Sequence, residues 1–280
     1  MMRGNCIAIL VGVVLVNSTA AQTSVRFVWK QGQPLTYRVE QTTSASDVAD
    51  GKTTETSSKM TTVKRWEVLT VDSAGVATLQ LSVAFLHFEV KTPKGDTLLF
   101  DSKEPEKSDP QLREQMGKFV GQPLAVLRVD GQGRVVEVKE SKQAPASRFE
   151  SDLPFVLLLP GAEGRPVQPG MAWERTYQVT LEPPQGTGDK FDAVQKYTCQ
   201  KIDGAAVTIS LTTTIKNLPT SPLDQVPLLE MQPEGEVVFD AVSGRLYSAR
   251  LRIDKELKGL QGEGSSYHFQ STYSEQLMKE

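Results

Sequence analysis

The longest regular pattern of apolar and polar positions covers residues 62–90. Side chains alternate along its first arm, where Trp66 and Val68 share one face, and again along its second arm, residues 77–85. Alternation with a period of two is typical of a β-strand with one buried face. The four residues between the arms, 72–75, are turn formers ending in glycine, which takes a positive φ without steric cost. The segment predicts a long antiparallel β-hairpin with one apolar face.

The phase of this alternation changes once in the second arm. Up to Phe85 the apolar positions are odd-numbered, and after it they are Leu86, Phe88 and Val90. A β-bulge shifts side chains in this way and bends the strand. We therefore expect a curved hairpin, with Phe85 as the last residue of its first apolar face.

The same order of elements occurs twice. Each half reads as a first strand, a long hairpin and a second hairpin: residues 35–39, 62–90 and 124–138, then residues 173–181, 190–215 and 234–253. Self-similarity of this kind indicates a duplicated unit. A last alternating segment, residues 265–277, is expected to close an edge. The pattern predicts a mainly β fold of curved antiparallel sheets, a half-barrel or an open barrel-sandwich, with one or two short helices.

The stretches between these strands are expected to be less regular. Residues 42–58 are polar and predict a turn or a solvated hairpin tip, and residues 91–109 predict a charged surface loop. Asp109 before Pro110 is a helix start, because aspartate caps free backbone N–H groups and proline suits the first helical position. A second helix is expected over residues 146–158.

That second helix would end in the apolar run Leu153–Leu159. The run holds more apolar side chains than one helix face buries, and large exposed apolar patches are uncommon on monomers. It is therefore expected to cover the concave side of the sheet, either as a lid over a ligand or as a permanent plug. The division of the chain is 1–21 signal peptide, 22–142 first β repeat, 143–170 helix and Pro/Gly connector, and 171–280 second β repeat.

The first 21 residues read as a secretory signal. Arg3 supplies the charged start, Ile7–Val16 is an apolar run, and Thr19, Ala20 and Ala21 form a small-residue cleavage site. The run is shorter than the about 20 residues of a membrane-spanning helix, so no membrane span is expected. We expect a bacterial protein exported to the periplasm or the extracellular space.

Charge and composition exclude several function classes. The whole chain carries 31 basic and 34 acidic residues, a formal net charge of −3. Such a balance gives no electrostatic reason to bind nucleic acid. Cys199 is the one cysteine left after cleavage, so we expect no internal disulfide, and it reads as a small buried apolar residue on a strand. With two histidines, His87 and His268, no catalytic constellation, no metal site and no cofactor are expected.

One segment carries a family resemblance. The residues that carry it are Leu153-Pro154, Leu159-Pro160 and 166–170 before Trp173, preceded by 121–124 and 130–134. Through them the chain is similar to a family of secreted bacterial proteins known only as a domain of unknown function. The resemblance covers most of the chain after residue 21 and implies no catalytic residues. Long curved antiparallel strands with helices on one side also resemble lipoprotein-carrier folds in outline.

These observations lead to two principal readings of function. The first is a non-catalytic exported protein, not an enzyme, that binds an apolar small molecule or lipid on the concave side of a sheet. The alternative is a structural or protein-interaction module whose partner is another protein of the cell envelope. An enzyme of unrecognised type is the least favoured reading. The expected ligand-binding residues are Trp66, Phe85, Phe155, Leu157, Trp173 and Tyr177.

Export can be tested directly. We expect the protein recovered outside the cytoplasm to begin near Gln22, because the small residues at positions 19–21 fit a signal-peptidase site. N-terminal sequencing of the recovered protein checks this, and a chain that still begins at Met1 would contradict it.

Overall fold

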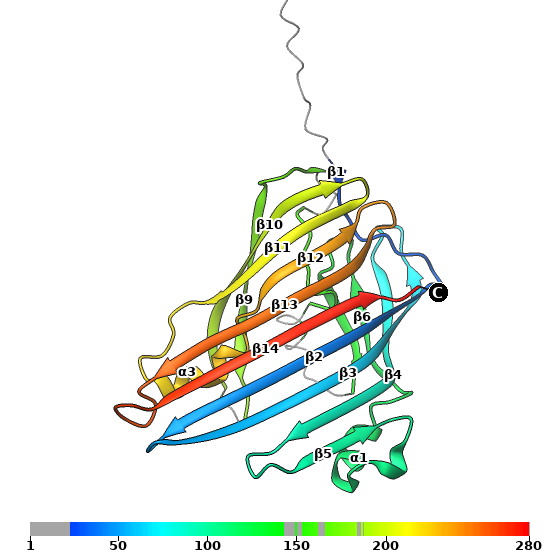
Figure 1. The fold of residues 1–280 in the computed structure, drawn as a ribbon. Coiled ribbons are helices and arrows are strands. Elements are labelled where there is room, and N and C mark those ends of the chain that lie inside the picture. The colour runs from blue at the N-terminus through cyan, green and yellow to red at the C-terminus, as the bar shows by residue number, and fades with distance from the viewer. Residues whose placement is uncertain are drawn as a thin grey trace, which may run out of the picture.

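The computed structural model describes residues 23–142, 149, 153–161, 166–183, 186 and 188–279. The expected signal peptide lies outside these residues, so it stays a prediction. In the described part of the chain, no helix is long and apolar enough to cross a membrane. The structure is mainly β, as the alternation of side chains predicted. It contains a large curved antiparallel sheet that is not closed into a barrel (Figure 1).

The elements follow the chain as two runs of neighbouring strands. The first run is β2 (Pro34–Ala49), β3 (Lys52–Val71), β4 (Ala77–Lys91), β5 (Thr97–Asp101), β6 (Pro123–Val129) and β7 (Val135–Ser141). The second is β9 (Ala172–Leu181), β10 (Asp189–Asp203), β11 (Ala206–Ile215), β12 (Glu234–Asp240), β13 (Arg245–Lys258) and β14 (Ser266–Leu277). Two short strands, β1 (Thr23–Ser24) and β8 (Pro166–Val167), pair with each other. The helices are α1 (Pro110–Gly117) and α3 (Pro222–Leu229), with a 3₁₀ turn at Pro105–Lys107.

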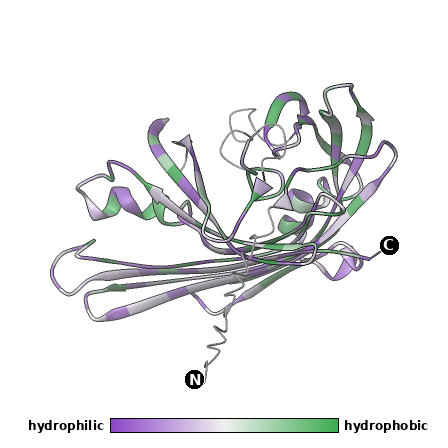
Figure 2. Cartoon of the chain, turned by 90° about the horizontal axis from the view of Figure 1, so that it is seen from above, coloured by the Kyte–Doolittle hydropathy of each residue, from purple (hydrophilic) through white to green (hydrophobic). Residues whose placement is uncertain are grey.

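All the long strands belong to one sheet. Its order is β7-β6-β4-β3-β2-β14-β13-β12-β11-β10-β9, with β5 beside β4. Each half is therefore an up-and-down meander, and the halves meet where β2 pairs with β14, from Tyr37 opposite Leu277 to Val48 opposite Ser266. Both halves keep the order expected from the sequence, and the duplication itself stays a prediction. Seen from above, the outer strands rise on the same side of the long central strands, so the sheet is curved (Figure 2).

The bulge in β4 lies one residue earlier than expected. Val83 pairs with Lys64 and Phe85 pairs with Val63, so Ala84 is the extra residue. Val83 and Leu86 consequently share one face and pack in the same cluster with Phe100 and Leu112. Phe85 does not belong to the first apolar face, which corrects that expectation.

The two polar stretches contain strands, and the first of them forms a hairpin tip, one of the two alternatives expected for it. Residues 42–58 are the outer halves of β2 and β3, joined by a two-residue turn at Asp50 and Gly51 with φ of 51° and 71°. Positive φ at both positions is typical of a type I′ turn, the tightest hairpin connection. Within residues 91–109, β5 pairs with β4 because the fully buried Phe100 needs an apolar neighbour.

The helix after Asp109 is confirmed, whereas the structure describes only part of the second expected helix, where residue 149 is helical and residues 153–158 are not. The Asp109 carboxylate accepts hydrogen bonds from the backbone N–H groups of Gln111 and Leu112 at 3.0 and 3.1 Å. Of the expected helix over residues 146–158, most of the first part lies outside the described residues. Residues 153–158 form turns and irregular backbone, where Val156 has a φ of 50°. The second described helix is α3, which lies between residues 215 and 234, where the sequence pattern predicted no element.

The main core lies on the concave side of the sheet and includes a strap, residues 25–29, that crosses it. Val25, Phe27 and Trp29 are at most 8% exposed. The strap is held by two turns: Phe27 N donates to Gly131 O at 2.7 Å, and Val28 N donates to Gly244 O at 3.0 Å. These turns join β6 to β7 and β12 to β13, so the strap connects corresponding hairpins of the two halves.

The contact of the strap with Gly244 can be tested. A Cβ atom at Gly244 would lie 2.5 Å from Val28 Cγ2, whereas one at Gly204 meets nothing within 4 Å, and both residues have positive φ. We expect Gly204→Ala to cost about 1–2 kcal/mol for the left-handed backbone alone. We expect Gly244→Ala to cost about 1–3 kcal/mol more, because the methyl group overpacks the strap. Urea unfolding checks this, and equal losses in the two variants would show that the strap does not press on this turn.

Candidate functional site

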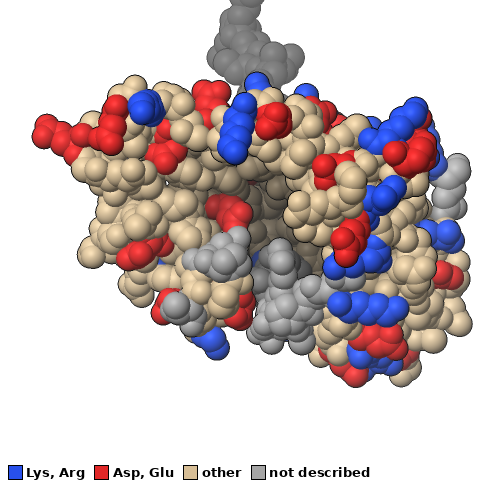
Figure 3. All heavy atoms as spheres, turned by 90° about the horizontal axis from the view of Figure 1, so that it is seen from below, with Lys and Arg blue, Asp and Glu red and all other residues tan. Residues whose placement is uncertain are grey.

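Two adjoining cavities open on the concave side of the sheet, next to the core. Their volumes are about 190 and 340 Å³, and both are lined by Leu153, Val156, Glu230, Pro233 and Leu251. We call them together the concave cavity. Viewed from below, the molecule is hollowed (Figure 3).

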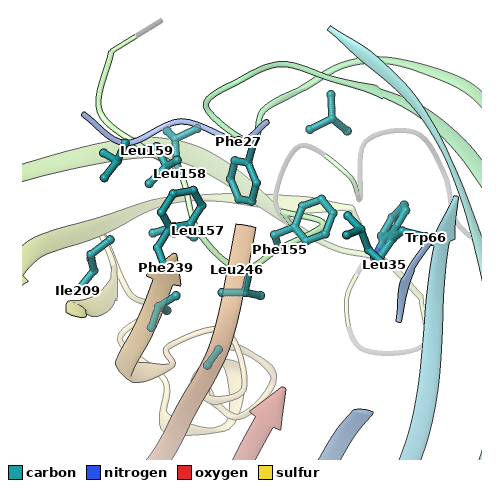
Figure 4. Packing of buried hydrophobic residues seen from close by; sticks show 14 of the residues in the cluster. Phe27, Leu35, Trp66, Phe155, Leu157, Leu158, Leu159, Ile209, Phe239 and Leu246 are labelled. Atoms are coloured by element: carbon teal, nitrogen blue, oxygen red, sulfur yellow. The ribbon is translucent and has the colours of Figure 1, made fainter. Parts of the chain in front are cut away.

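One side of the cavity is formed by residues 153–159, here called the plug. Phe155, Leu157 and Leu159 point into the core and are at most 1% exposed (Figure 4). The centre of the Phe155 ring lies 5.2 to 6.0 Å from the ring centres of Phe27, Trp29, Tyr37 and Trp66. Leu153 and Val156 instead line the cavity. The turn that reverses the plug at Val156 therefore gives it a core face and a cavity face.

The end of the plug is fixed by hydrogen bonds. Leu159 N donates to Gln132 O at 2.9 Å, and Gln132 Nε2 returns a bond to Leu159 O at 3.0 Å. Trp173 Nε1 donates to Leu158 O at 2.7 Å. Since these groups belong to β9 and to the turn before β7, the plug ties together the two outer regions of the sheet. In the described structure the apolar run is part of the core.

The opposite side of the cavity comes from the end of α3 and the residues after it. Leu228 and Leu229 are buried, and they place Glu230, Met231 and Pro233 over the sheet. The N-cap Ser221 and Pro222 at the first position define where the helix begins. This side contributes apolar surface with one carboxylate.

The floor of the larger cavity carries an ion pair. Lys64 Nζ lies 2.7 Å from Glu275 Oε1, and the Tyr273 hydroxyl donates to Glu275 Oε2 at 2.7 Å. The Lys64 side chain is 21% exposed and the Glu275 side chain is 0% exposed. Burial, with the neighbouring Glu275 carboxylate, raises the pKa of Tyr273 well above its ordinary value. The phenol therefore stays a hydrogen-bond donor at neutral pH.

A second polar group lies at the smaller cavity, on β9 and β10. Arg175 Nε donates to Gln195 Oε1 at 2.9 Å, and its guanidinium lies 4.1 Å from the centre of the Tyr177 ring. The Tyr197 hydroxyl also donates to Gln195 Oε1. Burial raises the pKa of Tyr197 to about 12. Gln195 Nε2 in turn donates to Thr213 Oγ1 at 3.1 Å. The buried amide therefore has partners on β9, β10 and β11, and these contacts hold Arg175 beside the cavity.

The six residues expected to bind a ligand are distributed over four places. Trp66, Phe155 and Leu157 lie together in the core. Trp173 stacks on Tyr197 with ring centres 5.7 Å apart. Tyr177 lines the smaller cavity. Phe85 is on the other face of β4 from Leu86, with Lys103 Nζ 5.0 Å from its ring centre, so it belongs to neither the core nor the cavity.

Sequence reasoning missed Lys64, Tyr273, Glu275 and Leu251. The parity of the strands contained a signal for the first three. Lys64 has the same parity as Trp66 and Val68, and Glu275 continues the odd-numbered aromatic positions of the last strand. A charged residue on the apolar face of a strand is uncommon unless it is paired.

The histidines and the cysteine lie outside the cavity lining. His87 Nδ1 is 2.9 Å from Asp101 Oδ2, and His268 Nε2 is 2.6 Å from Asp254 Oδ1. Cys199 is buried in the main core, as expected, and burial raises the pKa of its thiol. Within the described ranges, no group of three or more His, Cys, Asp or Glu side chains is placed to hold a metal ion.

Comparisons with known proteins add little. No family model matches the chain, and no curated protein matches it. A solved structure found by the search is that of DynF from the dynemicin biosynthesis pathway of Micromonospora chersina. It shares 6% identity over 97% of this chain and 94% of that chain, with a TM-score of 0.23. So low a TM-score carries no argument, and the resemblance to a secreted bacterial family stays a prediction.

The contacts of Trp173 predict a graded loss of stability. We expect Trp173→Ala to lower the free energy of unfolding by about 3 kcal/mol or more, because a large packed aromatic is removed. Trp173→Phe keeps a ring for stacking on Tyr197 but leaves Leu158 O without its donor, which costs about 1–3 kcal/mol. Chemical denaturation measures both values. An unchanged midpoint in Trp173→Ala would mean that the side chain does not hold the plug.

Proposed function

We propose that the protein is a non-catalytic exported binding protein that holds an apolar small molecule or a lipid in the concave cavity. The larger of the two spaces, about 340 Å³, lies within the range of about 300–1,000 Å³ for small-molecule sites. Its surroundings also fit such a site, since apolar side chains are combined with a few converging polar groups.

The observation that carries this proposal is a space of this size beside a filled core. Phe155, Leu157 and Leu159 already occupy the centre of the curved sheet. Protein interiors pack as closely as organic crystals and leave few voids larger than a water molecule. Leu153 and Val156 face the cavity from the plug and Leu251 faces it from β13, so apolar surface remains for a ligand to cover.

A second candidate is a structural or protein-interaction module of the cell envelope. It is favoured by the deep burial of the plug, which fills the concave side without any ligand. The sheet also ends in two edge strands, β7 and β9. Unpaired strand edges can accept a strand from another chain. A module of this kind would need the edges and not the cavity.

A binding titration separates the two candidates. We expect delipidated protein to bind a hydrophobic dye or a medium-chain fatty acid saturably, with one ligand per chain. We expect Leu153→Trp to weaken this binding at least tenfold, because the larger side chain fills space that both cavities share. Val242→Trp is the matched control, since Val242 is 83% exposed on the turn after β12.

Two results would contradict a ligand-binding role. The first is folded, delipidated protein that binds neither probe. The second is equal weakening by Leu153→Trp and Val242→Trp. Native mass spectrometry of protein purified from its own cell envelope adds an independent measurement, because a resident lipid would appear as a discrete added mass.

A further inference from the structure

We propose that the concave cavity recognises the carboxylate head group of an aliphatic chain through Lys64. The proposal rests on the proposed function and specifies the ligand. Two observations support it. One is the distribution of polar and apolar side chains around the larger cavity, and the other is that Lys64 lines this cavity whereas its buried partner Glu275 does not.

Four of the six polar residues that line the larger cavity lie on its floor, and the other two, Glu230 after α3 and Arg252 on β13, lie outside the floor. Gln41, Lys64, Ser271 and Tyr273 come from β2, β3 and β14, the three neighbouring strands at the centre of the sheet. The plug, β13 and the residues after α3 supply the apolar lining: Leu153, Pro154, Val156, Pro233, Leu251 and Ile253. A site with one polar end and one apolar side fits a ligand of the same construction.

The ion pair presents its cation to the cavity. Lys64 extends across β2 to reach Glu275 on β14, and the Lys64 side chain lines the space. Glu275 is 0% exposed and does not line it. Lys64 and Tyr273 both line the cavity and both contact the Glu275 carboxylate. A ligand at this end therefore meets the ammonium group first, while the compensating negative charge lies behind it.

The Lys64 ammonium group can donate a hydrogen bond to a ligand. A lysine carries three N–H donors. Among the described residues, Lys64 contacts Glu275 at 2.7 Å and the Tyr273 oxygen at 3.5 Å. One further N–H can therefore bond to a ligand oxygen, with Gln41 and Ser271 as neutral partners lining the same end. Anionic acceptors make hydrogen bonds roughly twice as strong as neutral ones.

These groups favour a carboxylate over a phosphate. A phosphate carries more charge and is usually held by arginine forks or several cations. Among the residues that the structure describes, Arg252 is the other cation lining this cavity, and its Nη2 lies 3.0 Å from Glu234 with its side chain 71% exposed. Lys64 with two neutral donors matches the single charge of a carboxylate.

The volume indicates the length of the chain. If each heavy-atom group takes roughly the 30 Å³ of a molecule of liquid water, a space of 340 Å³ holds about ten such groups. Octanoic acid has this size. It is therefore the probe of choice, with 1-octanol as a ligand of the same length without charge.

The test uses the opposite effects expected from the two partners of the ion pair. By calorimetry at pH 7, we expect wild-type protein to bind octanoate about tenfold more tightly than octanol. Glu275→Gln should raise the affinity for octanoate, because it removes the negative charge behind Lys64 and keeps an acceptor for Tyr273. Since Lys64→Met alone leaves Glu275 buried without its partner, the cation is removed in the double variant Lys64→Met with Glu275→Gln. This variant should lose the preference for octanoate while it still binds octanol.

Each other outcome has a defined meaning. Equal binding of octanoate and octanol by wild-type protein would overturn the head-group assignment and leave the cavity as an apolar site. Tighter binding of octyl phosphate than of octanoate would overturn the choice of carboxylate. An octanoate preference that is unchanged in both variants would show that the ion pair is only structural. Folded protein that binds none of these probes would overturn the proposed function itself.

Discussion

The pairing of β2 with β14 is the contact on which the rest of the structure depends. It joins the first long strand to the last one, and it turns two separate meanders into one curved sheet. The floor of the cavity exists only because of this pairing, since Lys64 on β3 reaches Glu275 and Tyr273 across β2. Contacts so distant in sequence carry a large loop-closure cost, and they slow folding. The concave site is therefore completed only when the last strand has been added.

The plug and the strap stabilise the sheet in the absence of barrel closure. A curved sheet of this size exposes an apolar concave face, and two irregular segments cover it. Phe155 fits among rings from the strap, β2 and β3, while hydrogen bonds to Gln132 and from Trp173 fix the far end of the plug. Irregular backbone in a core needs such partners, because an unpaired buried polar group costs as much as a lost hydrogen bond.

The alternation of side chains was enough to predict the mainly β class and the curvature, and the capping signal at Asp109 and Pro110 was enough to predict α1. Alternation was not enough where local signals compete. Asp50-Gly51 is a strong hairpin signal when apolar residues alternate on both sides of it. Here most of the flanking residues are polar, so the sequence did not show the two strands that this turn joins. Phe85 was assigned to the wrong face because parity alone does not locate a bulge to one residue. Residues 153–158 of the expected second helix are not helical, because tertiary contacts, not helical periodicity, place Phe155, Leu157 and Leu159. Strand parity indicated that Lys64 and Glu275 lie on apolar faces, but it could not show that they pair, because their strands are more than 200 residues apart in the chain.

The start of β2 and the end of β14 are paired with each other, and this has a mechanical consequence. Tyr37 near the start of β2 is paired with Leu277 at the end of β14, and Met278 N donates to Thr36 O at 2.8 Å. These ends lie side by side on antiparallel strands. Once the strap is released, a force that pulls the start of β2 away from the end of β14 loads the hydrogen bonds between these strands one after another. Strands loaded in this way resist far less than strands that must slide along their whole length. The seam that holds the halves together in equilibrium is thus also the line along which tension would separate them.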